Sequence, residues 1–577
     1  MSQRLVRRPA THQLDVGSPL LGRLYAGRGI RHLDEIDCSL QRLLSPGTML
    51  GLAPAGELLA ACVSGQQRIL VVGDFDADGA TSATLMVLGL RAMGALQVDY
   101  LVPNRFEYGY GLTPEIVLLA AGIDTPAQAL GDACPHLIIT VDNGISSLEG
   151  IALAKSLGIK VLVTDHHLPG DVLPAADVIV NPNQPGCQFA SKSLAGCGVA
   201  FYLLTAVRQA LRALNWFDPT IRAAPNLADY LDLVALGTIA DVVVLDQNNR
   251  ILVSEGIRRI RAGRCRPGIT ALLEQAGTDP RRLVSRDLAF GVGPRLNAAG
   301  RLEDMSLGIE CLLAPTIEDA RARAGHLDEL NKARRLIENE MKAQAQLNLK
   351  LQHNLTAGGH RTGVCLFNDD WHQGVIGIVA SRIKDQLHRP VFAFAQTTDN
   401  EMKGSGRSIA GLHIRDALAV IDARNPGLIL KFGGHAMAAG LTIKASEFET
   451  FARLFDEQAS ASLSQADLER VLVSDGAPGV PVDLPMVREM LEAMPWGQGF
   501  PEPLFDGDFE ILDQRIVGQR HLKMKLLSGN QTFDAIAFNQ DRLVEGRNKH
   551  MAYRLDINEY RGRQTVQLIV EAVDVFL

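Results

Sequence analysis

The sequence has few cysteines, no long apolar run and no excess of positive charge. Its eight cysteines stand singly and form no CxxC pair, a pattern typical of a reducing compartment and not of a disulfide framework or a zinc site. No stretch reaches the roughly 18 to 20 apolar residues that span a bilayer, and the first residues lack the apolar segment of a secretory signal. We therefore expect a cytoplasmic protein with no membrane contact.

The net charge of -8 argues against a protein that coats nucleic acid through bulk charge, although it leaves room for a local basic groove. The 577 residues are 47% hydrophobic and 21% charged, as in soluble globular proteins. At roughly one domain per 150 residues, the length predicts about three or four domains.

An acidic stretch, GDFDADGATS at 73–82, follows the apolar run RILVV. Asp74, Asp76 and Asp78 alternate there with no Lys or Arg among them, and their repulsion is costly unless water or a cation neutralises it. The EF-hand interpretation fails because the twelfth position of such a loop is Leu85, not Glu. The stretch indicates half of a divalent-metal site, with a solvated turn as the alternative.

Strand and helix patterns alternate around this stretch. The apolar cores of RILVVGD, QVDYLVPN, HLIITVD and KVLVTD are typical of parallel strands that are buried on both faces. We predict a doubly wound α/β sheet, whose ligands lie at the carboxyl ends of the strands.

More potential ligands follow apolar segments downstream: Asp142 in TVDNGIS, Asp165, His166 and His167 in TDHHLPG, and Asp241 in ALGTIADVVVL. Carboxylates with an imidazole suit Mn²⁺ or Mg²⁺. At least five candidates exceed what a single ion needs, so two ions about 3.5 to 4 Å apart fit better. The alternative for the His pair is a helix cap whose ring nitrogens bond to the backbone.

Five ordered motifs, GDFDADGATS, PNRFEYGYGL, TVDNGI, TDHH and ALGTIAD, resemble the DHH phosphoesterase superfamily, and its single-strand-specific DNA exonucleases most of all. The resemblance covers nearly the whole chain. It implies two-metal-ion hydrolysis of single-stranded DNA from 5′ to 3′, with release of 5′ mononucleotides, in DNA recombination and repair.

The resemblance also implies roles for individual residues. Asp76, Asp78, Asp142, His166 and Asp241 would bind the ions, with Asp74 and Asp165 as direct or supporting groups. His167 would contact the scissile phosphate or assist the leaving oxygen. These side chains are the expected catalytic and metal-binding residues.

Two segments near the predicted sheet are candidates for substrate contact. In PNRFEYGYG, Arg105 is assigned to a phosphate, and the aromatic series Phe106, Tyr108 and Tyr110 would stack on bases or pack on the core. FGVGPRLNAAGR at 290–301 is predicted as a Gly/Pro loop that presents Arg295, Asn297 and Arg301 to phosphates. A solvated loop is the alternative.

The charged, Pro-free segment 316–352 predicts a long helix that connects two lobes, with the cleft between them as the substrate channel. In the second lobe, GSGRS and FGGHAMAAGLTI hold Ser405, Arg407, Gly433, Gly434 and His435. Their glycines would let backbone N–H groups approach an anion, or form tight turns. By resemblance this lobe is the DHH-associated domain, which binds the end of the strand and its 5′ phosphate.

The tail alternates short β patterns with Gly and Asn turns, and 515–563 carries ten Lys or Arg against five Asp or Glu. An OB-like barrel that binds single strands is expected, with a β domain for protein contacts as the alternative. The predicted domains are a lead-in (1–50), partly helical and otherwise irregular, the DHH domain (51–315), the connecting helix (316–354), the DHH-associated α/β domain (355–460) and a linker with the barrel (461–577).

Two other functions remain open at this point. A DHH-family phosphodiesterase of short oligonucleotides or cyclic dinucleotides generally lacks the additional β domain. A non-catalytic replication scaffold typically loses metal ligands, all of which this chain retains. By resemblance the partners are single-stranded DNA, a single-strand-binding protein and a DNA helicase, and the chain is expected to be a monomer.

Overall fold

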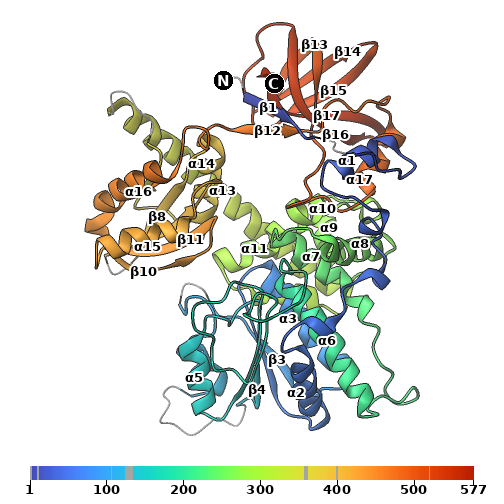
Figure 1. The fold of residues 1–577 in the computed structure, drawn as a ribbon, viewed down its shortest axis with the longest axis vertical. Coiled ribbons are helices and arrows are strands. Elements are labelled where there is room, and N and C mark those ends of the chain that lie inside the picture. The colour runs from blue at the N-terminus through green and yellow to red at the C-terminus, as the bar shows by residue number, and fades with distance from the viewer. Residues whose placement is uncertain are drawn as a thin grey trace. The chain divides into compact units, whose positions relative to one another are not determined.

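The computed structural model describes residues 3–9, 12–104, 107–123, 134–355, 361–397, 400–518 and 520–576. The chain folds into two compact units, each assembled from separate stretches. The larger unit comprises 8–331 and 475–571, and the smaller unit comprises 1–7, 332–474 and 572–577. Figure 1 shows the elements of both units.

The larger unit contains the predicted doubly wound parallel sheet. Its strand order is β3-β2-β4-β5-β6, and all neighbours pair in parallel. The strands are β2 (Ile69–Gly73), β3 (Val98–Leu101), β4 (Leu137–Val141), β5 (Lys160–Thr164) and β6 (Val178–Val180). The sequence therefore predicted every strand of this sheet except the short β6.

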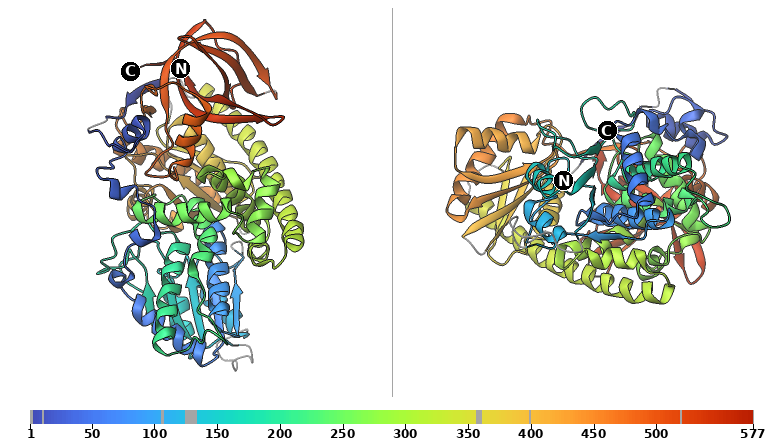
Figure 2. Two further views of the ribbon diagram at one scale, coloured as in Figure 1. Left: turned by 90° about the vertical axis from the view of Figure 1, so that its right-hand side faces the viewer. Right: turned by 90° about the horizontal axis from the view of Figure 1, so that it is seen from below.

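Helices cover both faces of this sheet (Figures 1 and 2). On one face α4 (Pro114–Ala121) and α5 (Leu148–Ser156) bury Ile116 and Ile151 against the Val and Ile side chains of β2, β4 and β5. On the other face lie α2 (Leu52–Ser64), α3 (Ala77–Ala92) and α6 (Gly196–Ala213). Burial on both faces explains why the strands are continuously apolar.

A helical layer follows the sheet in the chain. Its α-helices are α7 (Leu231–Ala240), α8 (Gln247–Arg261), α9 (Pro267–Ala276), α10 (Ser285–Asp287), α11 (Gly293–Leu302) and α12 (Ser306–Leu313). The prediction of a loop at 290–301 was wrong, because a π-helical turn, η6 (Leu288–Val292), continues directly into α11. Pro294 follows this π-helical turn, at the start of α11.

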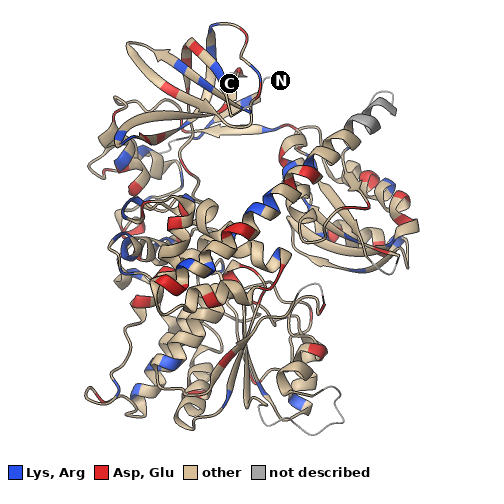
Figure 3. Cartoon of the chain, turned by 180° about the vertical axis from the view of Figure 1, so that it is seen from behind, with Lys and Arg blue, Asp and Glu red and all other residues tan. Residues whose placement is uncertain are grey.

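The long connecting helix was predicted correctly as α13 (Ile317–Leu355). Lys, Arg, Asp and Glu alternate along it (Figure 3). Its core-facing positions include Ala320, Ala324 and Leu327, all buried. The helix therefore packs on one stripe only, as its charge pattern indicated.

The smaller unit contains a mixed sheet of order β10-β11-β9-β8-β7. Its strands are β7 (Val364–Phe367), β8 (Val391–Gln396), β9 (Glu401–Arg407), β10 (Ile429–Gly434) and β11 (Ala438–Lys444). The helices of this unit are α14 (Ile376–Leu387), α15 (Ile414–Arg424) and α16 (Phe448–Ser462). Phe392, Phe394, Phe451 and Phe455 form an aromatic core between β8 and α16.

The tail closes into the predicted barrel, in the order β13-β14-β15-β17-β16. Its strands are β13 (Phe505–Val517), β14 (His521–Ser528), β15 (Gln531–Ala537), β16 (Asn548–Tyr560) and β17 (Arg563–Val573), and α17 (Leu484–Glu492) precedes them. The barrel belongs to the larger unit except for the end of β17.

Part of the lead-in is more regular than predicted. β1 (Gln3–Arg7) pairs in parallel with β12 (Val471–Ser474) and with β18 (Val575–Phe576), which joins distant parts of the chain. α1 (Pro19–Ala26) follows. Among the described residues, no single helix is long and apolar enough to cross a bilayer, although the bent pair Leu40–Thr48 and Leu52–Ser64 meets that test by length and composition.

Candidate metal centre

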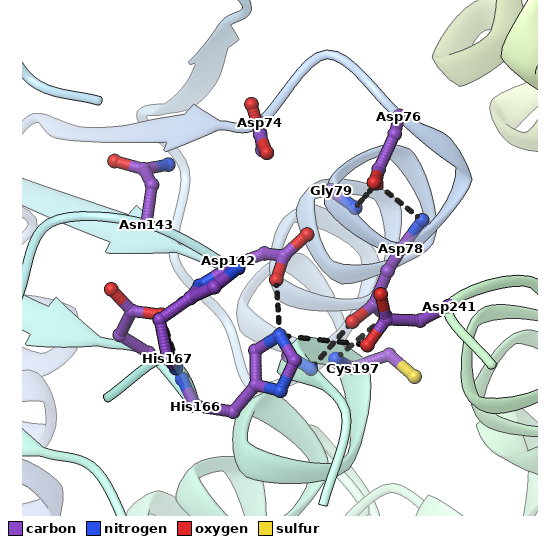
Figure 4. Close-up of polar contacts among 12 residues, drawn as sticks. Asp74, Asp76, Asp78, Gly79, Asp142, Asn143, His166, His167, Cys197 and Asp241 are labelled. Atoms are coloured by element: carbon purple, nitrogen blue, oxygen red, sulfur yellow. Dashed lines mark hydrogen bonds and ion pairs between the residues drawn. The ribbon is translucent and has the colours of Figure 1, made fainter. Parts of the chain in front are cut away.

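The acidic stretch forms the turn between β2 and α3. Asp76 is the N-cap of α3, and its Oδ1 accepts hydrogen bonds from the backbone N–H groups of Asp78 (2.9 Å) and Gly79 (3.0 Å). A Cβ on Gly79 would lie 2.3 Å from the carbonyl oxygen of Asp74. The glycine is therefore required for the tight turn that carries Asp74, Asp76 and Asp78 (Figure 4).

The carboxylate of Asp78 is almost fully buried, at 1% exposure. Its oxygens accept hydrogen bonds from the first N–H groups of α6, those of Gly196 (2.5 Å) and Cys197 (3.0 Å). A helix N-terminus stabilises a negative charge through its free N–H groups and its dipole. A Cβ on Gly196 would come within 2.6 Å of the Cβ of Asp142, so only glycine fits between the two acids.

Asp142 and Asp165 follow the ends of β4 and β5, as predicted. Asp142 is 2% exposed and has a left-handed backbone with φ of 63°, a conformation that Asp tolerates better than most residues. Asp165 accepts hydrogen bonds from the backbone N–H groups of His166, His167 and Ile145, and it contacts the His167 ring nitrogen Nδ1 at 2.8 Å. Asp165 is thus occupied by protein donors and orients the His pair.

Asp241 does not follow a strand, which corrects the expectation that the acids converge along one sheet edge. It is the C-cap of α7, and it meets the others from the helical layer. His166 connects Asp142 at the sheet with Asp241 on the helical layer. Its Nε2 lies 3.0 Å from Oδ1 of Asp142 and 3.5 Å from Oδ2 of Asp241 (Figure 4).

Burial and crowding raise the pKa values of three of these carboxyl groups. Burial, together with the charge of Asp241, raises the pKa of Asp78 to about 7. Burial and the charge of Asp76 likewise raise the pKa of Asp241 to about 7, and burial and the neighbouring acids raise the pKa of Asp142 well above its usual range. Without a cation, the site resists carrying all of its negative charges.

The two imidazoles also differ. Burial lowers the pKa of His166, and the adjacent charge of His167 lowers it further, which favours the neutral ring that metals bind. Burial alone would lower the pKa of His167, but the hydrogen bond to Asp165 and the surrounding carboxylates outweigh it and raise the pKa to about 9. His167 therefore carries a positive charge at neutral pH.

The donor set fits Mn²⁺ or Mg²⁺. Three groups of side chains have ligand atoms within 4.8 Å of one another: Asp74 with Asp76 and Asp142, Asp78 with His166 and Asp241, and Asp142 with His166 and His167. Within the described residues, Asp142 Oδ1, His166 Nε2 and Asp241 Oδ2 are buried and lack a hydrogen bond of good geometry. Buried polar atoms of this kind require a partner, and oxygen and imidazole donors are typical of these ions.

Two further residues lie at the centre that were not assigned to it. The hydroxyl of Tyr110 is 3.3 Å from Nδ1 of His167, and its ring contacts His167 and Phe75 edge-on. Asn143 is buried beside Asp142, where its Nδ2 donates to the carbonyl oxygens of Val72 and Val141. The aromatic series and the DNG sequence were the only signals for them.

The residues of the larger unit that were predicted to bind substrate have different positions from one another. Arg105 lies outside the described residues. Asn297 accepts a hydrogen bond from the backbone N–H of Ala77 (2.9 Å) and so braces the acidic turn. Arg301 lies near the end of α11 and is partly exposed.

Arg295 does not fit the predicted role of a phosphate ligand. Its guanidinium is 8% exposed, pairs with Asp328 at 2.8 Å and donates to the carbonyl oxygens of Gly291 and Gln275. All three of its nitrogens are used within the protein, so it ties η6 and α9 to α13. No sequence pattern indicated this pairing, because Asp328 is distant in the chain.

In the smaller unit, the GSGRS glycines lie inside β9 and not in a loop. β9 pairs with β8 on one side and β11 on the other, so its backbone N–H groups serve the sheet. A Cβ on Gly404 or Gly406 would come within 2.5 Å of the ring of Phe394 or 2.4 Å of that of Phe392. The expectation that these glycines bind an anion through the backbone was therefore wrong.

The side chains of Ser405 and Arg407 lie on the face of β9 opposite the phenylalanine rings and point toward the start of α14. Nη1 of Arg407 donates to Oγ of Ser405 at 3.2 Å, and a Cβ on Gly377 would come within 3.0 Å of both side chains. Gly433 and Gly434 end β10, where an added Cβ on Gly433 would meet no atom within 4 Å. His435 follows in the turn to β11, and its N–H donates to the carbonyl oxygen of Ala438 (2.7 Å).

Known proteins resemble this chain both domain by domain and over nearly its whole length. Residues 68–238 match the DHH family N-terminal domain, 360–461 the DHHA1 domain and 481–572 the RecJ OB domain. The sequence is 52% identical to the single-stranded-DNA-specific exonuclease RecJ of Dickeya dadantii over 98% of both chains, and 53% identical to that of Escherichia coli over 96% of both. The chain belongs to the RecJ family.

A solved structure of the RecJ family has the same fold. RecJ of Thermus thermophilus in complex with Mn²⁺ superimposes with a TM-score of 0.79 at 30% identity, covering 99% of this chain and 79% of that one. The Mg²⁺ complex of the same protein gives a TM-score of 0.74 at 29% identity, with coverage of 99% and 78%.

Proposed function

We propose that this RecJ-family chain is a metal-dependent exonuclease specific for single-stranded DNA, which acts in DNA recombination and repair. The observation that carries the proposal is that Asp74, Asp76, Asp78, Asp142, His166 and Asp241 form overlapping groups of potential metal ligands, which Asp142 and His166 join. The names of relatives at 52% and 53% identity give the same substrate.

Asp76, Asp78, Asp142, His166 and Asp241, with Asp74 beside them, would hold two Mn²⁺ or Mg²⁺ ions. When bound, such ions lower the pKa of water and neutralise the charge that develops on the phosphate in the transition state. The protein keeps the ligands in place through the N-terminus of α6 at Asp78 and the N-cap bonds of Asp76.

The charged His167 would donate a hydrogen bond to the scissile phosphate or to the leaving oxygen. Asp165 holds its ring, and Tyr110 contacts it from the exposed side. The hydrogen bond to Asp165 favours the protonated ring, because it raises the pKa of His167.

Substrate binding outside the centre involves both units in this proposal. Arg407 and Ser405, beside the start of α14, bind a phosphate at the end of the strand, near Gly433, Gly434 and His435. On the barrel, Arg515 lies opposite Lys523 in the ladder of β13 and β14, and Phe538, at 54% exposure, contacts His521 edge-on. Basic and aromatic groups on one face are typical of single-strand binding.

Finer parts of the proposal come from the family resemblance: 5′ to 3′ polarity, release of 5′ mononucleotides, a cytoplasmic location, and cooperation with a single-strand-binding protein and a helicase. The eight cysteines, unpaired in the structure, support a reducing compartment.

The test is to incubate the protein with single-stranded DNA, duplex DNA and RNA, each labelled at the 5′ or the 3′ end, in Mn²⁺, Mg²⁺ or chelator. We expect metal-dependent release of labelled mononucleotide at once from 5′-labelled single-stranded DNA, and progressive shortening of the 3′-labelled strand. Strand binding without cleavage in either metal would instead identify a non-catalytic scaffold. Cleavage restricted to the shortest oligonucleotides would identify the alternative phosphodiesterase.

A further inference from the structure

Two large apolar side chains are exposed on segments that adjoin Asp241, and the proposed metal chemistry uses neither of them. Phe290, on η6, is 74% exposed, and Val242, which directly follows Asp241, is 63% exposed. Phenylalanine is rarely so accessible on a folded protein, because burying its ring is favourable. An exposed apolar pair next to a reaction centre therefore indicates a ligand.

The two residues belong to segments that pack against each other. η6 contacts α7, and a Cβ on Gly293, three residues after Phe290, would lie 3.3 Å from the Cβ of Ala240. Ala240 directly precedes Asp241, so the segments that carry the two exposed side chains adjoin a predicted metal ligand. All of these residues belong to the larger unit.

The local backbone is unusual at both positions. Val242 has φ of 62°, a conformation that β-branched residues very rarely adopt and that persists only where the surroundings impose it. Phe290 lies in a π-helical turn, and such turns occur frequently at functional sites. Gly291, the next residue, packs toward Ala276, which leaves the ring of Phe290 outside.

We propose that Phe290, supported by Val242, binds the face of a nucleobase of the strand whose phosphate occupies the metal centre. This inference rests on the proposed function. A phosphodiester at Asp241 carries its base within a few ångströms, and an uncharged flat base matches an apolar surface that offers no charge. Stacking on an aromatic ring tolerates every base, as an exonuclease that degrades any sequence needs. Phe290 is thus a positioning residue.

The main test compares Phe290→Ala with Phe290→Trp and Phe290→Leu on single strands with either intact bases or abasic sites scanned over the first six nucleotides. Because one base-aromatic stack corresponds to roughly a 5-fold to 100-fold change in affinity, F290A should raise KM by about that factor. F290W should retain the wild-type KM, and F290L should fall between them. An abasic site at the stacked position should remove the difference between wild type and F290A.

A matched control is Leu96→Ala. Leu96 is 81% exposed and precedes β3, at the amino ends of the strands and hence opposite the metal centre. L96A should behave as wild type. Since both positions are exposed, neither variant should change the melting temperature by more than a degree or so. An F290A enzyme with the KM of L96A would overturn the inference, as would an F290A defect of equal size on intact and abasic strands.

A second measurement separates this inference from the proposed function. A strand with 2-aminopurine at successive positions is titrated with protein in chelator, where no cleavage takes place. Quenching at one position by the wild type but not by F290A supports the stack even if the protein proves not to be a nuclease. Equal fluorescence with both proteins at every position refutes it, whatever the activity assay shows.

Discussion

At the scale of single residues, the centre is a set of acids that the fold holds together against their repulsion. Asp78 and Asp142 are almost fully buried, and their raised pKa values reflect the cost of charging them side by side. Such an unfavourable arrangement persists in a folded protein where a bound cation offsets the repulsion. The metal-free protein should therefore gain stability when one of these charges is removed.

We expect Asp142→Asn to abolish nuclease activity while the protein becomes more resistant to heat in chelator. The amide keeps the shape of the side chain but binds no cation strongly, so kcat should fall by more than about 100-fold. The melting temperature in chelator should rise by a few degrees, because the repulsion with Asp78 is relieved. Asp99→Asn, at a carboxylate with 87% side-chain exposure, is the control. An active D142N enzyme would contradict the assignment of Asp142 as a ligand.

The pKa shifts also predict how pH affects the protein. The pKa values of Asp78 and Asp241 are raised to about 7, against about 3.9 in an unfolded chain. The folded protein therefore holds more protons between about pH 4 and 7, so the stability of the metal-free form should fall as pH rises through this window. The fall should continue to about pH 9, because the pKa of His167 is raised to about 9 against about 6.5 in an unfolded chain, so the folded protein keeps that proton longer.

Metal binding should show the opposite trend, since the ions bind the charged carboxylates. The affinity for Mn²⁺ should rise by up to about tenfold per pH unit for each proton released, and level off near pH 7. Calorimetric titrations with Mn²⁺ at pH 5.5, 6.5 and 7.5 measure this, and Asp241→Asn should make the dependence shallower. An affinity independent of pH would show that the acids are already ionised in the metal-free protein.

At the scale of secondary-structure elements, the sequence predicted best those features that local pattern determines. Apolar runs such as 69–73 and 137–141 identified the strands, and the acids after them lie at the carboxyl ends of the sheet. Asp241 was predicted as a ligand at the end of a strand, but it caps the helix α7, because a short apolar run does not distinguish a helix from a strand. Gly and Pro at 291–294 suggested a loop, yet the packing of η6 and α11 overrides that propensity.

The contribution of α6 was not predictable from local pattern. Its N-terminus supports Asp78 from more than 110 residues away in the chain, and GCGVA at 196–200 has no capping residue to mark it. Likewise, the sequence drew attention to the glycines of β9, but the anion-binding role predicted for them was wrong. They accommodate phenylalanine rings of the neighbouring strand β8. No local sequence pattern predicts either this packing or the contact between α6 and Asp78.

This explanation of β9 predicts that Gly406→Ala destabilises the protein. The added methyl group would lie 2.4 Å from the ring of Phe392 in a closely packed core, and overpacking of this kind costs about 1 to 3 kcal/mol. Gly440→Ala on β11 is the matched control, because its nearest atom would be 3.8 Å away. Thermal melts of both variants should show a loss for G406A only, and Phe392→Leu should restore part of it. Equal melting temperatures for the two variants would show that the packing of the phenylalanine rings does not require glycine in β9.

At the scale of the whole molecule, the barrel is fastened to the catalytic unit by specific contacts. The hydroxyl of Ser285 donates to the carbonyl oxygen of Trp496 at 2.6 Å, and Arg286 pairs with Asp556 of β16 and with Glu502. These bonds involve α10, which directly precedes η6 and Phe290. A DNA strand held by the barrel would thus be held by the same compact unit that contains the predicted metal ligands, although the chain as a whole is acidic.

The basic face of the barrel should therefore determine the salt dependence of long-strand degradation. Each phosphate that a side chain neutralises releases counterions and contributes about 0.7 to the slope of log affinity against log salt for single strands. Arg515→Gln with Lys523→Gln should raise KM on strands of several tens of nucleotides at about 0.15 M salt and lower that slope by about 1.4. Strands too short to reach the barrel should show little change. The control is Arg212→Gln near the far end of α6, about 24 Å along the helix from Gly196, whose N–H contacts Asp78. If the double variant and the control have the same slope, the strand does not follow this face of the barrel, and the barrel serves protein contacts instead.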